Sequence, residues 1–229
     1  MKKVNVFLPC RKGSERVPQK NIKSFGGFKN GLIEIKLKQL INSKYIDIIY
    51  LTTNDDEILD YAKSLNNQKI ILHKRLEELS SSQTSTDDLV AHALDLIKEG
   101  DILWTHVTSP FLTADVYDQI IEKYFSEQKN GYDSLMTTNL MHGFFWNKRN
   151  PINYDRSIEK WPRTQTIEPI YEINSAVFLT NAKIYQSLND RIGRIPYLYP
   201  LDKIQGFDID WQDDFNIAQA IIRSGLVSL

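Results

Sequence analysis

Residues 4–21 read VNVFLPCRKGSERVPQKN, an apolar run that passes directly into a polar loop. The run Val4 to Leu8 has the length and composition of one buried strand, which ends at Pro9. The loop that follows, up to Asn21, contains four basic side chains, a glycine, a hydroxyl and an amide. Backbone N–H groups exposed by a glycine, together with nearby cations, are typical of a phosphate-binding site. Composition alone favours a phosphate-binding site and a solvated basic loop equally. The loop matches neither the Walker motif GxxxxGK[ST] nor the dinucleotide-binding motif GxGxxG.

Strands and helices alternate along the chain after this loop. Apolar patterning predicts strands at 46–52, 69–73, 102–107 and 175–179. Helical spacing and capping residues predict helices at 32–41, from the acidic cluster at 54–56 to about 65, and at 87–98, 113–125 and 211–223. The alternation predicts an α/β fold with a doubly wound, mostly parallel sheet and right-handed crossovers. Such sheets bind ligands where the carboxyl ends of the strands meet, so the loops after Leu8, His73 and Val107 form the candidate site.

The pattern breaks between about residues 139 and 174. This stretch has little helical period and carries three prolines and the aromatic residues Phe144, Phe145, Trp146 and Trp161. We interpret it as an inserted, β-rich arm on a single domain that spans residues 1–229. Exposed aromatic side chains favour association, so we expect the arm to form a homodimer.

Composition narrows the range of partners. The 28 basic and 29 acidic residues give a net charge of −1, so no global field attracts nucleic acid or an anionic membrane. The single cysteine, Cys10, precludes an internal disulfide, and a packing role is expected for it. No apolar stretch reaches the length of a membrane span or resembles a secretory signal. We therefore expect a cytoplasmic protein that binds any anionic ligand at a local site.

Short motifs in a fixed order resemble those of a known family, the CMP-sialic acid synthetases (acylneuraminate cytidylyltransferases). Leu8 to Asn21 resembles the family's first loop, roughly P-A-R-x-G-S-K-x-x-x-x-K-N. Four later segments are similar to family motifs in the same order, namely Arg75 to Thr86, Thr108-Ser109-Pro110, Asn174 to Phe178 and Asp208-Ile209-Asp210. The resemblance covers nearly the whole chain, and five ordered motifs are more specific than any one of them. It implies a Rossmann-like nucleotidyltransferase fold and the transfer of CMP from CTP to the anomeric hydroxyl of an acidic sugar, with release of pyrophosphate.

The resemblance also implies which residues contact the nucleotide. Arg11, Ser14 and Lys20 would hold the phosphates. The full expected nucleotide set is Arg11, Gly13, Ser14, Arg16, Lys20, Asn21, Arg75, Thr84 and Thr86. Among these, Lys20 and Arg11 are expected to be catalytic. A lysine suits this role because its charge can follow the negative charge that builds on the α-phosphate and the leaving pyrophosphate.

Two carboxylates near the end of the chain are candidate metal ligands. Asp208 and Asp210 lie two residues apart, and on an extended segment such residues point the same way. Because Mg²⁺ prefers one or two carboxylates with phosphate oxygens and water, we expect this pair to hold Mg²⁺ or Mn²⁺ and to take part in catalysis. The alternative is a helix-capping cluster with Asp213 and Asp214.

The acidic sugar would be held by His106, Arg163 and Asn174. Arg163 lies in a Pro162-Arg163-Thr164-Gln165 segment that resembles the family's R-Q motif near the sugar. A guanidinium fork suits a carboxylate because it can donate two parallel hydrogen bonds. His106 comes at the carboxyl end of a predicted strand, where it could touch the sugar.

Departures from the family motifs leave the acceptor open. Glu15 stands where the family has a lysine, and Leu112 stands where an arginine often follows the T-S-P turn. An aromatic residue, Phe145 or Trp146, replaces an expected lysine in the arm. Sialic, legionaminic or pseudaminic acid, a shorter acid such as Kdo, or another acceptor all remain candidates. A metal-dependent glycosyltransferase and a non-catalytic nucleotide-binding module are the competing functions, and only the transferase proposed from the resemblance would release pyrophosphate.

Overall fold

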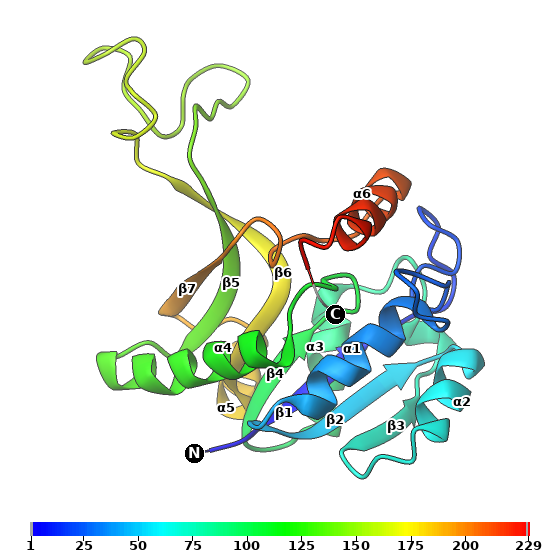
Figure 1. Ribbon diagram of the computed structural model, residues 1–229. Coiled ribbons are helices and arrows are strands. Elements are labelled where there is room, and N and C mark those ends of the chain that lie inside the picture. The colour runs from blue at the N-terminus through cyan, green and yellow to red at the C-terminus, as the bar shows by residue number, and fades with distance from the viewer. Residues whose placement is uncertain (1, 228) are drawn as a thin grey trace.

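The computed structural model describes residues 2–227 and 229, and these residues form a sheet of seven strands. The strand order is β3-β2-β1-β4-β6-β5-β7 (Figure 1). Neighbouring strands are parallel except β6, which runs antiparallel to both β4 and β5. The strands are β1 (Val4–Pro9), β2 (Ile46–Thr53), β3 (Ile70–Lys74), β4 (Asp101–Thr105), β5 (Ser134–Met141), β6 (Ile170–Asn181) and β7 (Pro196–Leu201). The predicted mostly parallel sheet is thus confirmed.

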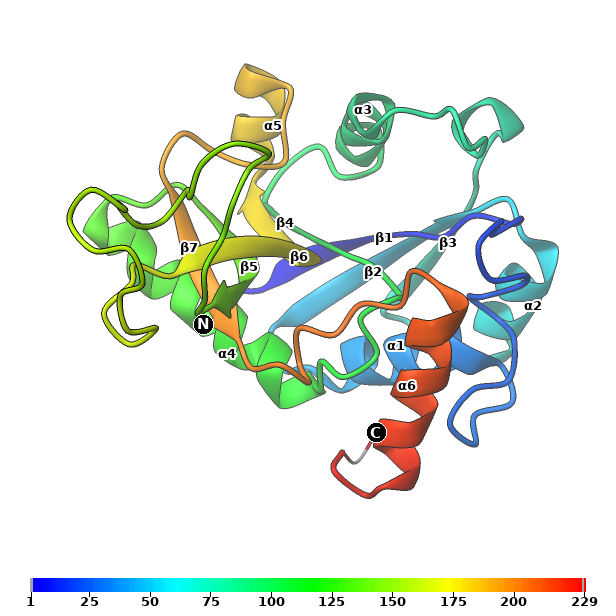
Figure 2. The same cartoon turned by 90° about the horizontal axis from the view of Figure 1, so that it is seen from above.

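Helices cover both faces of the sheet (Figure 2). The larger core cluster takes side chains from α1 (Gly31–Asn42), α2 (Asp56–Ser64), α4 (Ala114–Glu127) and α6 (Gln212–Arg223). The smaller cluster, around Phe7 and Trp104, lies under α3 (Thr86–Leu96) and α5 (Ala182–Leu188). Two short 3₁₀ turns, η1 (Glu77–Leu79) and η2 (Gln128–Asn130), complete the elements. Within the described residues, no helix is both long and apolar enough to cross a membrane.

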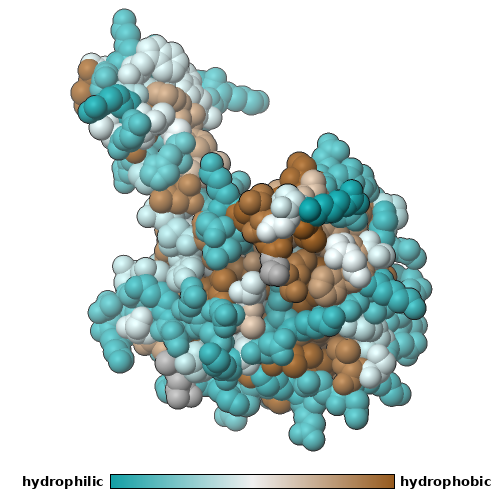
Figure 3. Space-filling model, viewed as in Figure 1, coloured by the Kyte–Doolittle hydropathy of each residue, from teal (hydrophilic) through white to brown (hydrophobic). Residues whose placement is uncertain are grey.

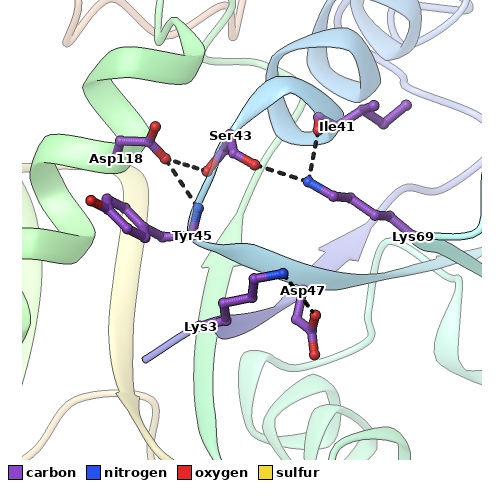
Figure 4. Close-up of polar contacts among 7 residues, drawn as sticks. All are labelled: Lys3, Ile41, Ser43, Tyr45, Asp47, Lys69 and Asp118. Atoms are coloured by element: carbon purple, nitrogen blue, oxygen red, sulfur yellow. Dashed lines mark hydrogen bonds and ion pairs between the residues drawn. The ribbon is translucent and has the colours of Figure 1, made fainter. Parts of the chain in front are cut away.

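Buried polar contacts fasten the amino-terminal edge of the sheet (Figure 4). Asp118 of α4 accepts hydrogen bonds from the Ser43 hydroxyl at 2.6 Å and from the Tyr45 backbone N–H at 3.4 Å. Lys69 donates to the carbonyl oxygens of Ile41 and Ser43 at 2.8 and 2.9 Å. These contacts join α1, α4 and the start of β3. They therefore fix the amino-terminal ends of the strands, and the loops at the carboxyl ends extend from a rigid sheet.

The segment between β5 and β6 projects from the body (Figures 1 and 3). We call residues 142–169 the arm. The base of the arm is held by the pairing of β5 with β6, in which Met141 lies opposite Ile170. Within the arm itself, the strand pairing that the structure describes is an isolated bridge between Trp146 and Pro151. The predicted β-rich character is therefore wrong for most of the arm. The physical reason is its composition, since the Asn- and Pro-containing run 147–153 favours turns over extended ladders.

Candidate active site

A cavity of about 380 Å³ opens at the carboxyl ends of β1 and β4. The described charged residues that line it are four cations and one carboxylate, namely Arg11, Arg16, Lys20, Arg75 and Glu15. Ser14, Asn21, His106 and Thr108 also line this space, which we call the basic cavity. On a chain with a net charge of −1, this local excess of positive charge suits an anionic ligand.

Arg75 is held in the basic cavity by the protein but keeps one donor group unused. It is 4% exposed, its Nη2 donates to the Cys10 carbonyl at 2.8 Å, and its Nε donates to the Ser80 hydroxyl at 3.0 Å. Its buried Nη1 has no hydrogen-bond partner in the part of the chain that the structure describes. An unpaired buried donor costs free energy, so Nη1 points to an acceptor supplied by a ligand.

The neighbouring Cys10 is not a nucleophile. Burial raises the pKa of its thiol to about 12, although the positive charge of Arg75 partly opposes this shift. A thiol that stays protonated near neutral pH is a poor nucleophile, so the packing role expected for Cys10 holds.

The first loop is shaped by its own backbone and by short polar contacts. Gly13 has a φ of +79°, a conformation that favours glycine, and no described atom lies within 4 Å of the position that a Cβ would take. The Asn21 side-chain amide donates to the Arg11 carbonyl at 3.0 Å, and Asn54 accepts from the Lys12 backbone N–H at 2.8 Å. The amide of Asn21 thus closes the loop, and its contact with a nucleotide stays a prediction.

Lys20 lines the basic cavity and contacts an aspartate that lines a second one. Its side chain is nearly buried, its Nζ donates to the Ile209 carbonyl at 2.6 Å, and the same Nζ lies 3.7 Å from Asp210 Oδ1. Burial lowers the pKa of Lys20, while the carboxylates of Asp210 and Asp208 raise it and favour the charged form. The result is a desolvated ammonium group held at a fixed position in the basic cavity, next to Asp210.

The second cavity, of about 390 Å³, lies beside the late acidic segment. We call it the acidic cavity; it is lined by Asn139, Glu172, Ile173, Asn174, Ser175, Lys203, Gly206, Phe207, Asp208 and Asp210. Asp208 and Asp210 therefore face the same space, as their spacing predicts. The Ile209 backbone N–H between them donates to the Thr108 carbonyl at 2.9 Å, which ties this segment to the Thr108-Ser109-Pro110 turn beside the basic cavity.

The donor set in the acidic cavity fits a magnesium-like cation. Asp208 Oδ1 is buried without a hydrogen-bond partner among residues 2–227 and 229, and burial raises the pKa of this carboxyl. A cation would relieve both effects by pairing with the oxygen. The described residues contain no group of three or more His, Cys, Asp or Glu side chains placed to hold a metal on their own. Two carboxylates with phosphate and water ligands is the arrangement that Mg²⁺ prefers.

The capping alternative for this pair is wrong. Asp214 supplies the cap of α6, because its Oδ2 accepts from the Asp210 backbone N–H at 3.0 Å and from the Trp211 backbone N–H at 2.7 Å. Asp208 and Asp210 line the acidic cavity instead, and Asp210 Oδ1 pairs with Arg16 and Lys20.

The structure places two of the three expected sugar contacts in different cavities. His106 lines the basic cavity, and its Nε2 accepts from Trp104 Nε1 at 3.0 Å. Burial lowers the pKa of His106 to about 3, so the ring is neutral and carries its proton on Nδ1. Asn174 lines the acidic cavity, where its Oδ1 accepts from the Thr137 hydroxyl at 2.7 Å.

Four predicted residues line neither cavity, namely Gly13, which belongs to the first loop, and Thr84, Thr86 and Arg163. Thr84 donates to the Glu78 carbonyl at 3.2 Å and so shapes its own loop, and Thr86 is exposed at the first position of α3. Arg163 is exposed on the arm. Within one chain, the structure therefore does not bring the side chains of Thr84, Thr86 and Arg163 to the other candidate residues.

Sequence reasoning missed two residues of this region. Lys36 of α1 is fully buried and donates to the Ser109 carbonyl at 2.7 Å and to the Tyr117 hydroxyl at 2.6 Å, which fixes the turn beneath Thr108. Burial lowers the pKa of Lys36 to about 7. The sequence did contain a signal for Lys36, because this lysine falls among the apolar residues whose spacing predicts the buried face of the helix. Trp211, the residue after Asp210, places its ring 5.0 Å from the Arg16 guanidinium carbon, and no local pattern indicates that contact.

Comparisons with known proteins agree on one family. A family model described as cytidylyltransferase matches residues 6–210. The chain is 23% identical to a pseudaminic acid cytidylyltransferase of Campylobacter jejuni over 224 residues, covering 95% of both chains. It is 28% identical to an N-acylneuraminate cytidylyltransferase of Oncorhynchus mykiss, covering 99% of this chain and 52% of that protein.

Solved structures share the fold. One is a CMP:2-keto-3-deoxy-manno-octonic acid synthetase complexed with CTP, with a TM-score of 0.68 and 12% identity over 98% of this chain and all of that one. Another is the 4-diphosphocytidyl-2C-methyl-D-erythritol synthase of Anaerococcus prevotii, with a TM-score of 0.66 and 16% identity over 97% and 96% of the two chains. At these identities the likeness establishes the fold alone.

Proposed function

The chain belongs to the cytidylyltransferase family, and from this premise we propose that it transfers CMP from CTP to the anomeric hydroxyl of a nonulosonic acid. The observation that carries the proposal is the contact that links the two cavities, in which Nζ of Lys20, a residue of the basic cavity, lies 3.7 Å from Oδ1 of Asp210, a residue of the acidic cavity. A nucleotide in the basic cavity would present its α-phosphate at this contact, and a sugar in the acidic cavity would approach from the other side. As the hydroxyl oxygen bonds to the α-phosphorus and loses its proton, the bond to the β-phosphate breaks and pyrophosphate leaves.

The residues of the basic cavity would bind the triphosphate and the base. Arg11, Arg16 and Lys20 supply positive charge, and Ser14 supplies a hydroxyl. Arg75 lines the cavity and its Nη1 has no partner among the described residues, so it would donate to a ligand acceptor such as the carbonyl of cytosine. Asp208 and Asp210 would hold a divalent metal, which would supply positive charge to the phosphate oxygens at the reacting centre.

We expect CTP to be used at least about 100-fold more efficiently, in kcat/KM, than UTP, ATP or GTP. A site that pairs buried polar groups with one base leaves them unpaired with another, and such mismatches discriminate strongly. The measurement is pyrophosphate release with Mg²⁺ and each of pseudaminic, legionaminic and sialic acid and Kdo as acceptor, with acceptor-free reactions as controls. Equal use of all four nucleotides with the best acceptor would contradict the assignment. Absence of pyrophosphate with every acceptor would favour the glycosyltransferase or the binding module.

The arm supports a further proposal, a homodimer with shared sites. Its aromatic side chains pack on one another, with Phe144 5.2 Å from Tyr154 and 5.4 Å from Trp161 between ring centroids. Phe144 and Trp161 remain exposed nonetheless, Trp161 at 65%, and the aliphatic Ile158 of the same arm is 86% accessible. Apolar surface of this kind is characteristic of an interaction site. We propose that it packs against a second copy and brings Arg163 to the partner's acidic cavity, where the guanidinium would bind the sugar carboxylate.

Mixing two inactive variants tests this arrangement. If Arg163 acts on the partner's site and Lys20 on its own, a heterodimer of Arg163→Ala and Lys20→Ala subunits contains one site with both residues intact. Random exchange should therefore restore pyrophosphate release to about a quarter of the wild-type rate. An Arg149→Ala variant, which removes another arm charge, should be active by itself. Activity that stays at the level of the separate variants would place both residues in one chain.

A further inference from the structure

We propose that Arg16 and Trp211 make metal binding at Asp210 depend on the arrival of the nucleotide's triphosphate. The inference rests on the proposed function, in which Asp210 is a metal ligand. It assigns Arg16 a position in the nucleotide-free protein that differs from its position in the complex, and it assigns Trp211 a role as a positioning residue.

Two cations share one oxygen of Asp210. Arg16 Nη2 lies 2.8 Å and Lys20 Nζ 3.7 Å from Asp210 Oδ1. A divalent metal approaching this oxygen would meet both positive charges, and Coulomb repulsion at such distances is substantial. In the absence of nucleotide, the pairs therefore oppose metal binding at Asp210, although Asp208 Oδ1 is left without a partner in the described chain.

Trp211 holds Arg16 in this arrangement. The guanidinium carbon lies 5.0 Å from the centroid of the Trp211 ring, within the range of a cation–π contact. The Trp211 backbone is itself fixed, because its N–H donates to Asp214 Oδ2 at 2.7 Å. This contact explains why an aromatic side chain that is 60% exposed stands directly beside Asp210.

A triphosphate would reverse the arrangement. Arg16 lines the basic cavity and its side chain is half exposed, so it can turn from the carboxylate oxygen to phosphate oxygens, while Lys20 stays on the Ile209 carbonyl. The guanidinium fork forms stronger, bidentate bonds with phosphate, whereas an exposed ion pair contributes little stability and is easily exchanged. With Arg16 withdrawn, and with the charge of Lys20 balanced by the phosphates, Asp210 Oδ1 is open to the metal. By thermodynamic linkage, nucleotide and metal then strengthen each other's binding.

The test uses Mn²⁺ and the full-length, nucleotide-free protein, with free Mn²⁺ measured by electron paramagnetic resonance. Arg16→Gln should tighten Mn²⁺ binding by about threefold to fivefold, the scale of one exposed ion pair. Trp211→Ala should shift the affinity in the same direction, and the double variant should gain no more than Arg16→Gln alone, because both changes release the same contact. Arg223→Gln, at the far end of α6, removes an equal charge and should leave the affinity unchanged. Unchanged or weaker Mn²⁺ binding by Arg16→Gln would overturn the proposal.

The emission of Trp211 supplies a second readout. CTP in EDTA should change the tryptophan fluorescence by withdrawing Arg16 from the ring, and Trp211→Phe should abolish that change. Mg²⁺ without nucleotide should leave the emission unaltered; the same change with Mg²⁺ alone would overturn the proposal. Mn²⁺ affinity that does not respond to Asp210→Asn would remove the metal assignment and this inference with it. These measurements contain no sugar acceptor, so they test the metal-binding proposal alone. Pyrophosphate release with an acceptor tests the transfer reaction separately.

Discussion

Lys20→Ala is expected to lower kcat by about 100-fold or more while changing CTP binding much less. Only contacts that strengthen between the ground state and the transition state accelerate the chemical step. Lys20 fits that description because its ammonium is buried, is fixed by the Ile209 carbonyl at 2.6 Å, and lies in the basic cavity 3.7 Å from Asp210 Oδ1. In such a desolvated position its charge acts strongly on the negative charge that develops at the α-phosphate and the leaving pyrophosphate.

Single-turnover pyrophosphate release and equilibrium CTP binding, measured on the same protein, separate the two effects. Lys23→Ala is a suitable control, because Lys23 belongs to the same loop region but directs its Nζ to the Phe215 ring, 5.2 Å from the centroid. The control should retain wild-type turnover. An unchanged kcat in Lys20→Ala would remove Lys20 from the mechanism, and a rise in KM alone would make it a ground-state contact.

The part of the sheet from β1 to β4 was predictable because each strand is followed by a helix with its own local signals. The side chains of Asp55, Ser85 and Thr113 each accept a hydrogen bond from a backbone N–H in the first turn of the next helix. Asp, Ser and Thr before an apolar helical pattern predict this contact, and so they predict where the helix begins. The half beyond β4 was less predictable. Strand β7 contains Pro196 and Pro200, which argue against a strand, and it tolerates them at the edge of the sheet. The seven residues of α5 are too few to show helical periodicity.

Motif order located the candidate site better than local pattern could. Arg11 and Lys20 belong to the loop after β1 and Arg75 follows β3, and the structure brings them to one cavity because the loops after parallel strands share one edge of the sheet. Contacts across that edge were not predictable. The pairing of Arg16 with Asp210, and the carbonyl of Ile209 beside Lys20, depend on how the last loop crosses the first. The position of Arg163 depends on the arm, whose few contacts with the body are at its base.

Asp208→Asn should abolish stimulation by Mg²⁺ and lower kcat/KM by about 100-fold or more, without loss of fold stability. The amide keeps the shape of the carboxyl group but removes the charge that would hold the cation. In the metal-free protein the carboxylate is a cost, since its Oδ1 has no partner among the described residues and burial raises its pKa. When folding raises the pKa of a carboxyl group, the charged form is less stable in the folded protein than in the unfolded chain. The group therefore lowers the free energy of unfolding once the pH rises above its pKa in the unfolded chain. The melting temperature of metal-free Asp208→Asn should therefore be unchanged or higher, by about 2 °C for each kcal/mol relieved.

Asp214→Asn is the matched control, because Asp214 is the carboxylate that caps α6. Its Oδ2 accepts two backbone N–H groups, and the neutral amide oxygen of asparagine replaces these charge-assisted bonds with weaker ones, so the melting temperature should fall by about 2 °C. Its dependence on Mg²⁺ should persist. Activity titrated against Mg²⁺, with thermal unfolding in EDTA, separates the two variants. If Asp208→Asn instead melted as early as Asp214→Asn and kept its response to Mg²⁺, Asp208 would be a structural residue, and the cation would have to be held by Asp210 and the phosphates alone.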